Sequence, residues 1–324
     1  MTNEPIQKYA RYVVFAILAI IALYFSTQVL LLSSLPTDPR RAPDVHLRNP
    51  QNVQFIAVGH TGDTLESRMQ FLQSIQSTCE NRGCDFLFLL GDLLPPHGMS
   101  GNRDPKMDKW VRDVFRPLGK PIYAILGTND YGSPFDRQVG VREVRWATRT
   151  KGFEMPSSNY FFRGGAASFW AFDTSELIWG HTGPQTAWLT ESLGKSSTSL
   201  RIGFGHHGMP KLSGSHTQLT PEEASSLGPF HTNHICGAFD LFISTDSDHL
   251  SWTNHCGTSW IYSGSNHATQ ASNAPKESSL FASPGPGYIW VDASENQIDV
   301  ELYDKYGKLL FSGTRNLDGS MGIE

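Results

Sequence analysis

The sequence predicts an α/β fold, a two-sheet β-sandwich flanked by helices and preceded by one transmembrane helix. Strand and helix patterns alternate from residue 53 onward, and polar residues follow several strands directly. An uncharged apolar run lies near the N-terminus. The 324 residues, 39% of them hydrophobic, suffice for one large domain with a full core. The net charge of −5 does not favour a nucleic-acid partner.

The N-terminal run predicts a membrane anchor. After a short tail at residues 1–11, Tyr12–Leu32 comprises 21 residues without a charge. At about 1.5 Å per residue, such a helix is long enough to cross a bilayer. The sequence Leu30–Leu35 offers no convincing cleavage site, so we expect an uncleaved signal anchor; the alternative is a long cleaved signal peptide. Residues 33–52 contain four prolines and predict a stiff, solvated linker.

The globular part is expected to span residues 53–315, with a tail at 316–324. Its first half begins with the apolar strand Val53–Val58 and the helix Leu65–Gln76, in which apolar residues recur at helical spacing. Nearly continuous apolar runs at Asp85–Leu90 and Pro121–Leu126 are typical of strands buried on both faces. A helix between them starts at Pro105.

The second half has more strands. Tyr160–Phe172 has antiparallel character, and two helices are predicted at Pro184–Leu193 and Pro221–Leu227. The remaining predicted strands are Leu200–Phe204, Phe239–Ser244, Ser259–Ser263, Tyr288–Asp292, Gln297–Tyr303 and Leu309–Gly313. Together these patterns predict two sheets packed on each other with helices outside.

The four cysteines form two local pairs. Cys79 and Cys84 flank a short link between a helix and a strand, and Cys236 and Cys256 flank a strand and its loop. An even number in two pairs predicts two disulfides and an oxidising compartment. The globular domain is therefore expected on the non-cytoplasmic side of the membrane. The alternative is four unpaired, buried thiols.

Five polar runs stand at the carboxyl ends of predicted strands. They are Gly59–Asp63, Gly91–Asp92, Gly127–Asp130, Gly205–His207 and Asp246–His249. In open α/β sheets, ligands bind beyond the carboxyl ends of the strands, so these runs are expected to form one site. Carboxylates and imidazoles converging there are the ligands of a two-metal hydrolase.

The order of these motifs resembles the calcineurin-like metallophosphoesterases, and in particular their purple acid phosphatase branch. The resemblance covers about residues 53–268 and rests mainly on Cys84–Asp92, Pro121–Gly127 and the Gly205-His206 pair. It implies a metal-dependent phosphoric ester hydrolase fold with two metal ions at the strand ends.

By this resemblance, five positions can still bind metal. Asp92, at the bridging position, and His206 match the family in type, whereas His60 replaces an aspartate. The paired histidines of the family fall on Asp246 and Asp248; a one-residue slip of register would bring in His249 instead. Each side chain also has a structural interpretation, because aspartates often cap turns and a strand-end histidine can be a buried hydrogen-bonding residue.

Other family positions are lost. Pro95 replaces the tyrosine ligand, Thr128 the asparagine ligand and Asn129 the phosphate-contacting histidine. Asn129 is still a candidate phosphate contact. The set predicts one divalent cation rather than two, with magnesium, manganese or calcium suited to its oxygen-rich character.

Three functions follow as hypotheses. The first is a membrane-anchored pseudo-phosphatase that retains metal or ligand binding, with a phosphate ester or a protein as partner. The second is an active phosphomonoesterase with a rearranged or single-metal site. The third is an envelope scaffold that binds a partner protein through loops such as Gly98–Pro105 and Lys211–Thr220.

Overall fold

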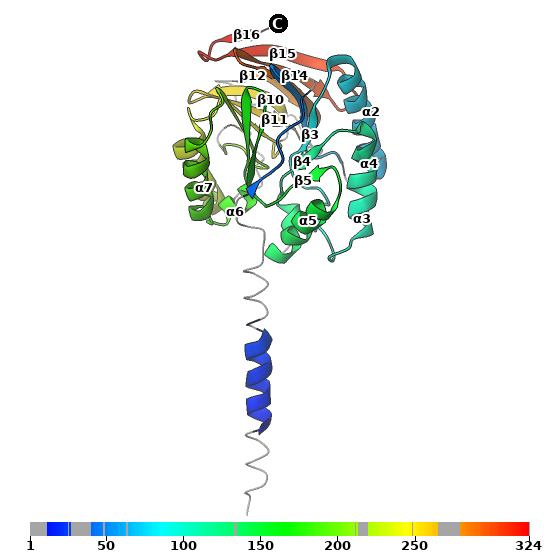
Figure 1. Cartoon of the computed structure of the whole chain (residues 1–324), viewed down its shortest axis with the longest axis vertical. Helices are drawn as coiled ribbons and strands as arrows, with labels where there is room; N and C mark the ends of the chain where they lie inside the picture. Colours follow the sequence, from blue (N-terminus) through cyan, green and yellow to red (C-terminus); the bar gives the residue numbers. More distant parts are fainter. Residues whose placement is uncertain are drawn as a thin grey trace, which may run out of the picture. The chain divides into compact units, whose positions relative to one another are not determined.

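The computed structural model describes residues 12–24, 26, 40–47, 49–62, 64–132, 135–210, 212, 220–247, 249–264 and 279–323. The chain divides into two units, Met1–Asp38 and Pro39–Glu324. The second unit contains two mixed eight-stranded sheets with helices on their outer faces, which confirms the predicted α/β architecture (Figure 1).

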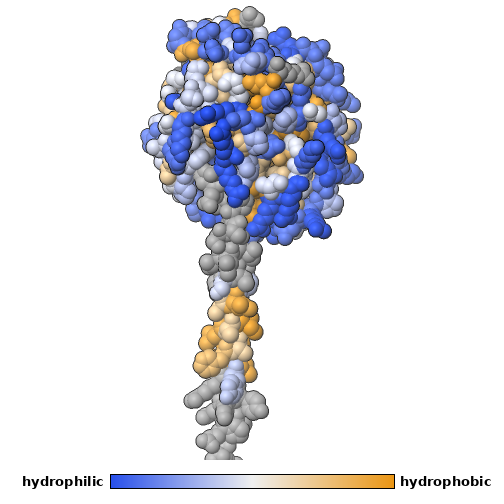
Figure 2. All heavy atoms as spheres, viewed as in Figure 1, coloured by the Kyte–Doolittle hydropathy of each residue, from blue (hydrophilic) through white to orange (hydrophobic). Residues whose placement is uncertain are grey.

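The N-terminal unit contains a helix at residues 12–24. Its apolar side chains, such as Phe15, Ile20 and Leu23, are exposed, and they form the apolar segment seen in Figure 2. No helix among the described residues is both long and apolar enough to cross a membrane. Much of the predicted span Tyr12–Leu32, namely residue 25 and residues 27–32, lies outside the described residues, as does the tail at 1–11.

The first sheet of the globular unit has β2 (Asn52–Val58) near its centre. On one side β3, β4 and β5 continue the sheet in parallel; on the other side β13, β14, β15 and β16 are antiparallel to their neighbours. The bounds are β3 (Phe86–Leu89), β4 (Ile122–Ala124), β5 (Phe153–Glu154), β13 (Gly287–Ser294), β14 (Gln297–Asp304), β15 (Leu309–Asn316) and β16 (Met321–Ile323).

The second sheet has β7, β8, β9 and β11 in parallel at its centre, and antiparallel strands toward both edges. Its order is β1 (Arg40–Arg41), β6 (Tyr160–Gly164), β7 (Ala167–Ala171), β8 (Leu200–Phe204), β9 (Leu241–Ser244), β11 (Thr258–Ser263), β10 (His249–His255) and β12 (Ser279–Pro284).

Aromatic side chains fill the space between the sheets. Phe55 and Phe88 of the first sheet contact Phe204 of the second, with ring centroids 5.7 and 3.7 Å apart. Phe86 contacts Phe169 in the same way, at 5.4 Å. Rings packed at these distances add to the stability gained from burying their area. This core holds the two sheets together, and their strand ends therefore lie in fixed positions.

The helices lie outside the two sheets. α2 (Leu65–Arg82), α3 (Pro105–Met107), η1 (Asp108–Arg112), α4 (Asp113–Phe115), η2 (Arg116–Leu118), η3 (Asn129–Tyr131) and α5 (Arg137–Arg149) belong to the first half. α6 (Thr174–Ile178), α7 (Gly183–Gly194), α8 (Pro221–Phe230) and η4 (His231–Ile235) follow. Figure 1 shows α2 to α5 along one sheet and α6 and α7 along the other.

The globular unit extends beyond the expected limits at both ends. Within the region expected to be a linker, Arg40 and Arg41 pair with β6, and Ala42 and Val45 are buried. The backbone N–H groups of Ala42 and Val45 donate to the carbonyl oxygens of Phe161 and Arg163 in β6. Pro43 is tolerated between them because an edge strand needs hydrogen bonds on one side only. At the other end β16, within the expected tail, pairs with β15.

Both predicted disulfides are present. Cys79 is joined to Cys84, and Cys236 to Cys256. The first joins the last turns of α2 to the segment entering β3, and the second joins the end of η4 to the β10–β11 turn. The alternative of four free thiols is therefore wrong.

Candidate metal centre

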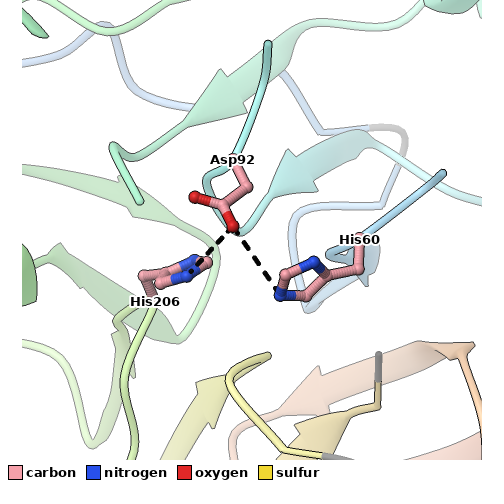
Figure 3. A group of neighbouring side chains, drawn as sticks. All are labelled: His60, Asp92 and His206. Carbon is pink, nitrogen blue, oxygen red and sulfur yellow. Dashed lines mark ion pairs between the residues drawn. The ribbon is translucent and has the colours of Figure 1, made fainter. Parts of the chain in front are cut away.

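Three side chains from three strand ends meet at the carboxyl edge of the sheets. His60 follows β2, Asp92 follows β3 and His206 follows β8. One ligand atom from each lies within 4.8 Å of the others, so the three could hold one metal ion. Figure 3 shows Asp92 Oδ2 between the rings, 3.9 Å from His60 Nε2 and 3.5 Å from His206 Nε2. Asp92 and His206 are buried, and His60 is partly exposed.

The backbone is unusual at two of these three residues. His60 has φ 44° and Asp92 has φ 54°, both in the left-handed region. Non-glycine residues seldom adopt this conformation, and where they do the surrounding structure holds them there, often at functional sites. Packing around the group is also tight. A Cβ on Gly127 would lie 2.3 Å from Asp92 Oδ1 and 2.7 Å from His206 Nδ1, so only glycine fits there.

His206 is oriented by the backbone. Its Nδ1 lies 2.8 Å from the carbonyl oxygen of Leu90, which can only accept, so Nδ1 carries the proton. In the neutral ring Nε2 is then the atom available to a metal. Burial by itself would lower the pKa of His206, but the carboxylates of Asp92 and Asp246 raise it above its usual value. Without a metal, His206 therefore tends to carry a proton that a bound ion would displace.

Asp92 is held in its ionised form by its neighbours. Burial by itself would raise its pKa, but His206, His60 and hydrogen bonds from Asn129 lower it overall. The Asn129 backbone N–H donates to Oδ1 at 2.9 Å, and the Asn129 side-chain amide donates to Oδ2 at 2.8 Å. Asn129, predicted to contact phosphate, thus has its amide nitrogen directed at the carboxylate.

Thr128 contacts His207, which belongs to one of the five polar runs but was not predicted as a metal ligand. Its hydroxyl lies 2.9 Å from His207 Nε2, and the hydroxyl of Thr174 lies 2.9 Å from His207 Nδ1. Burial lowers the pKa of His207 well below its usual value, so this ring is neutral. In the sequence, His207 could have been recognised because two consecutive histidines follow a predicted strand. The rings of His206 and His207 contact each other edge to face, with their centroids 4.8 Å apart.

Asp130 supports the loops around the site. It is fully buried, and its two oxygens accept the backbone N–H groups of Leu93 and Gly127, both at 2.8 Å. Burial, and then the nearby charge of Asp92, raise its pKa to about 6. Asp130 therefore ties the loop carrying Asp92 to the loop carrying Asn129.

Asp246, the aspartate of the last run that the structure describes, is not among the residues of the group. The Asp246 backbone N–H donates to the carbonyl oxygen of His206 at 3.0 Å, and its carboxylate influences the pKa of His206. Among the described residues, however, only His60, Asp92 and His206 bring ligand atoms together. Asp248 lies outside the described residues, and His249 is the first residue of β10.

Sequence comparison gives one distant relative. No protein-family model matches the chain. Purple acid phosphatase 3 of Arabidopsis thaliana is 21% identical over 291 residues, which cover 80% of this chain and 76% of that protein.

Two solved structures share the fold. GAP50, described as the anchor in the inner membrane complex of Plasmodium, superposes with a TM-score of 0.64 at 18% identity over 84% of this chain and 89% of that chain. A dimetal phosphatase from Danio rerio superposes with a TM-score of 0.51 at 12% identity, over 79% of this chain and 97% of that chain. The resemblance seen in the sequence is confirmed at the level of the fold: this chain has the fold of the calcineurin-like metallophosphoesterases.

Proposed function

We propose that this protein is a membrane-anchored metallophosphoesterase-fold protein that binds one divalent cation and is catalytically impaired. The observation that carries the proposal is the ligand group itself. Only His60, Asp92 and His206 converge among the described residues. A two-metal centre needs two ions about 3.5–4 Å apart, each with its own ligands and a bridging carboxylate.

The contacts around the group argue against a second ion. Asp92, at the bridging position, has both oxygens hydrogen-bonded to Asn129. Thr128, at the family's asparagine-ligand position, has its hydroxyl hydrogen-bonded to His207 instead. Pro95 has no donor atom in its side chain. A second ion would therefore lack ligands at two of the family's positions, those of Thr128 and Pro95.

Two imidazoles and one carboxylate suit zinc, manganese or iron better than calcium, which prefers six to eight oxygens. This set is richer in nitrogen than the five-residue set expected from the sequence. A bound ion would supply Lewis acidity toward a phosphate ester or another oxyanion. His206 would offer Nε2 while Leu90 holds its Nδ1 proton, and Asn129 would keep Asp92 in place.

The step that we expect to be impaired is protonation of the leaving oxygen. At the family's phosphate-contacting histidine position this chain has Asn129, and an amide does not donate a proton to a leaving oxygen at neutral pH. The neighbouring imidazole, His207, is buried and has both ring nitrogens within hydrogen-bonding distance of threonine hydroxyls. A single-metal phosphomonoesterase is the second candidate, favoured by the left-handed backbone at His60 and Asp92.

Membrane attachment is part of the same proposal. The uncharged run Tyr12–Leu32 and the exposed apolar side chains of helix 12–24 support a single-pass anchor. The description of GAP50 as an anchor in a membrane complex supports an anchoring or scaffold role here, with Gly98–Pro105 as a candidate partner-binding loop. The two disulfides support a globular domain on the non-cytoplasmic side.

A phosphatase assay tests the impairment. The full chain in detergent is loaded with zinc, manganese, iron(II) or magnesium and assayed with p-nitrophenyl phosphate, beside the variant Asp92→Ala. We expect turnover no higher than that of the variant. Robust turnover that Asp92→Ala abolishes would show a working enzyme and overturn the impairment, while leaving metal binding intact.

A further inference from the structure

A basic hollow lies at the other end of the first sheet from the metal centre. It has a volume of 580 Å³ and is bounded by the segments that enter β4 and β5. The metal centre lies beyond the carboxyl ends of the strands, whereas this hollow lies at the amino ends of β4 and β5, next to the segment η1–η2 and the last turn of α5. Its charged lining residues are Arg112, Arg116, Lys120, Arg149, Lys151 and Glu154.

Five cations thus face one carboxylate in a protein whose net charge is −5. Arg112 is paired with Asp108 and Asp113, at 2.8 and 2.9 Å. Arg116, Arg149 and Lys151 are exposed, and their side chains make no hydrogen bond or ion pair within the described part of the chain. The single carboxylate, Glu154, has its pKa raised by burial.

Helix capping explains only part of this charge. Arg149 lies in the last turn of α5 and Arg116 in η2, where a cation offsets the negative end of the helix dipole. Lys120 and Lys151 lie beyond those helix ends, in the loops that enter the strands. The cations therefore come from separate segments that surround one concave space, and a concave surface of one sign focuses its electric field.

We propose that this hollow binds a ligand carrying several phosphate groups close together. Guanidinium groups pair with phosphate oxygens through two parallel hydrogen bonds, and ammonium groups add point charges. A hollow of this size accommodates a small ligand, and a single phosphate would engage only some of the cations. The same chemistry is offered by a soluble polyphosphate and by the headgroup of a polyphosphorylated lipid.

The test uses the full chain in detergent and titrates inorganic tripolyphosphate by calorimetry, with inorganic monophosphate as a second titrant. We expect saturable binding of tripolyphosphate that weakens with salt, and much weaker binding of monophosphate. The double variant Arg149→Glu/Lys151→Glu should bind tripolyphosphate about tenfold or more weakly. The matched control Lys305→Glu/Lys308→Glu makes the same charge change between β14 and β15, several strands away in the same sheet, and should bind normally.

Two further arms separate the alternatives. Asp92→Ala should leave tripolyphosphate binding unchanged; loss of binding in that variant would assign the anion to the metal centre and overturn the proposal. Binding to micelles doped with phosphatidylinositol bisphosphate is compared with binding to micelles doped with phosphatidylserine, to test whether the ligand is a lipid headgroup. Tighter binding of either the polyphosphorylated lipid or the soluble tripolyphosphate supports the proposed site. No saturable binding, or equal loss in the matched control, would also overturn it. The neutral pair Arg149→Gln/Lys151→Gln gives a graded loss if the charge reversal fails to fold.

Discussion

Asp92 is the residue on which the candidate centre depends. Its Oδ2 faces both histidines, and the backbone and side chain of Asn129 hold the carboxylate in place. The hydrogen bonds from Asn129 and the left-handed backbone at Asp92 are contacts and conformations of the protein itself. Metal binding at this group therefore competes with a proton on His206 and should weaken as the pH falls.

A second buried carboxyl gives a prediction about pH and stability. Asp173 is fully buried, accepts a hydrogen bond from the hydroxyl of Tyr131 and caps α6 by accepting the N–H of Glu176 at 3.1 Å. Burial, and then the nearby charge of Glu176, raise the pKa of Asp173 from 3.8 to about 7. The folded state therefore binds a proton that the unfolded state has released, so this group's contribution to stability falls as the pH rises from 3.8 to about 7.

Asp173→Asn removes that titration and keeps an oxygen that can accept these hydrogen bonds. The free energy of unfolding of the variant relative to the wild type should rise with pH, by at most about 1.4 kcal/mol per pH unit. Urea unfolding at several pH values between 3.8 and about 7 measures this difference in the free energy of unfolding. Asp136→Asn, an exposed helix cap, is the control. A difference that does not change with pH would show that Asp173 titrates normally.

At the level of single residues, the sequence indicates part of the site. Asp92 and His206 keep the family's residue types, and His60 stands at an equivalent strand end, so all three could be named and all three meet. The partners of Asn129 and Thr128 could not be named, because both contacts depend on side-chain directions set by the loops. Asp246 follows a strand as expected, but its contact with the His206 backbone depends on the bend after β9.

α2 contributes to the site through one buried side chain. Arg68 is 2% exposed, and its guanidinium donates to the carbonyl oxygens of Gly62 at 3.0 Å and Leu93 at 2.8 Å. Gly62 lies in the loop that carries His60, and Leu93 directly follows Asp92. Arg68 therefore connects the two loops whose side chains must converge.

Arg68→Ala should lower the free energy of unfolding by roughly 2–4 kcal/mol, because buried carbonyl groups lose their donor. It should also weaken metal binding, since the loops of His60 and Asp92 lose their shared contact. Denaturant unfolding and metal titration measure the two effects. Arg103→Ala, at an exposed position, is the control and should change neither. Normal metal affinity in Arg68→Ala would show that the loops are held by other contacts.

Strands with continuous apolar runs were predicted, whereas the helix α5 and the strand β10 were missed. β2, β3 and β4 have apolar runs typical of strands buried on both faces. α5 (Arg137–Arg149) was missed although its buried residues Gly140, Val144 and Ala147 recur at helical spacing. Its valines and its glycine have low intrinsic helix propensity, and packing of the apolar face decides its conformation. β10 was also missed: its polar sequence His249–His255 becomes a strand because β11 and β12 pair with it on both sides.

We infer one functional site at each of two ends of the globular unit. One end carries the candidate metal centre at the carboxyl ends of β2, β3 and β8, and the other carries the basic hollow at the amino ends of β4 and β5. Sequence patterns favour the first end, because its residues follow strands in recognisable runs. They do not indicate the hollow, because its cations are scattered between residues 112 and 151 and only the fold gathers them.

The anchor gives a prediction for the whole chain. If Tyr12–Leu32 spans a membrane, the protein expressed in cells should stay in the membrane pellet after carbonate extraction. Leu18→Arg/Ile21→Arg places two charges in the apolar run, each costing about 2.5–3.5 kcal/mol at the centre of a span, and should release the protein. Leu309→Arg/Leu317→Arg, at exposed positions of the globular unit, is the matched control and should stay in the pellet. Release of the control, or retention of the double variant, would contradict the anchor.

We infer that this fold keeps one cation site with three protein ligands. The most direct measurement is the metal content of the purified full chain by elemental analysis, beside Asp92→Ala. We predict about one divalent ion per chain in the wild type, matching the one group found among the described residues, His60, Asp92 and His206, and none in the variant. Two ions per chain, or one ion that persists in Asp92→Ala, would contradict it.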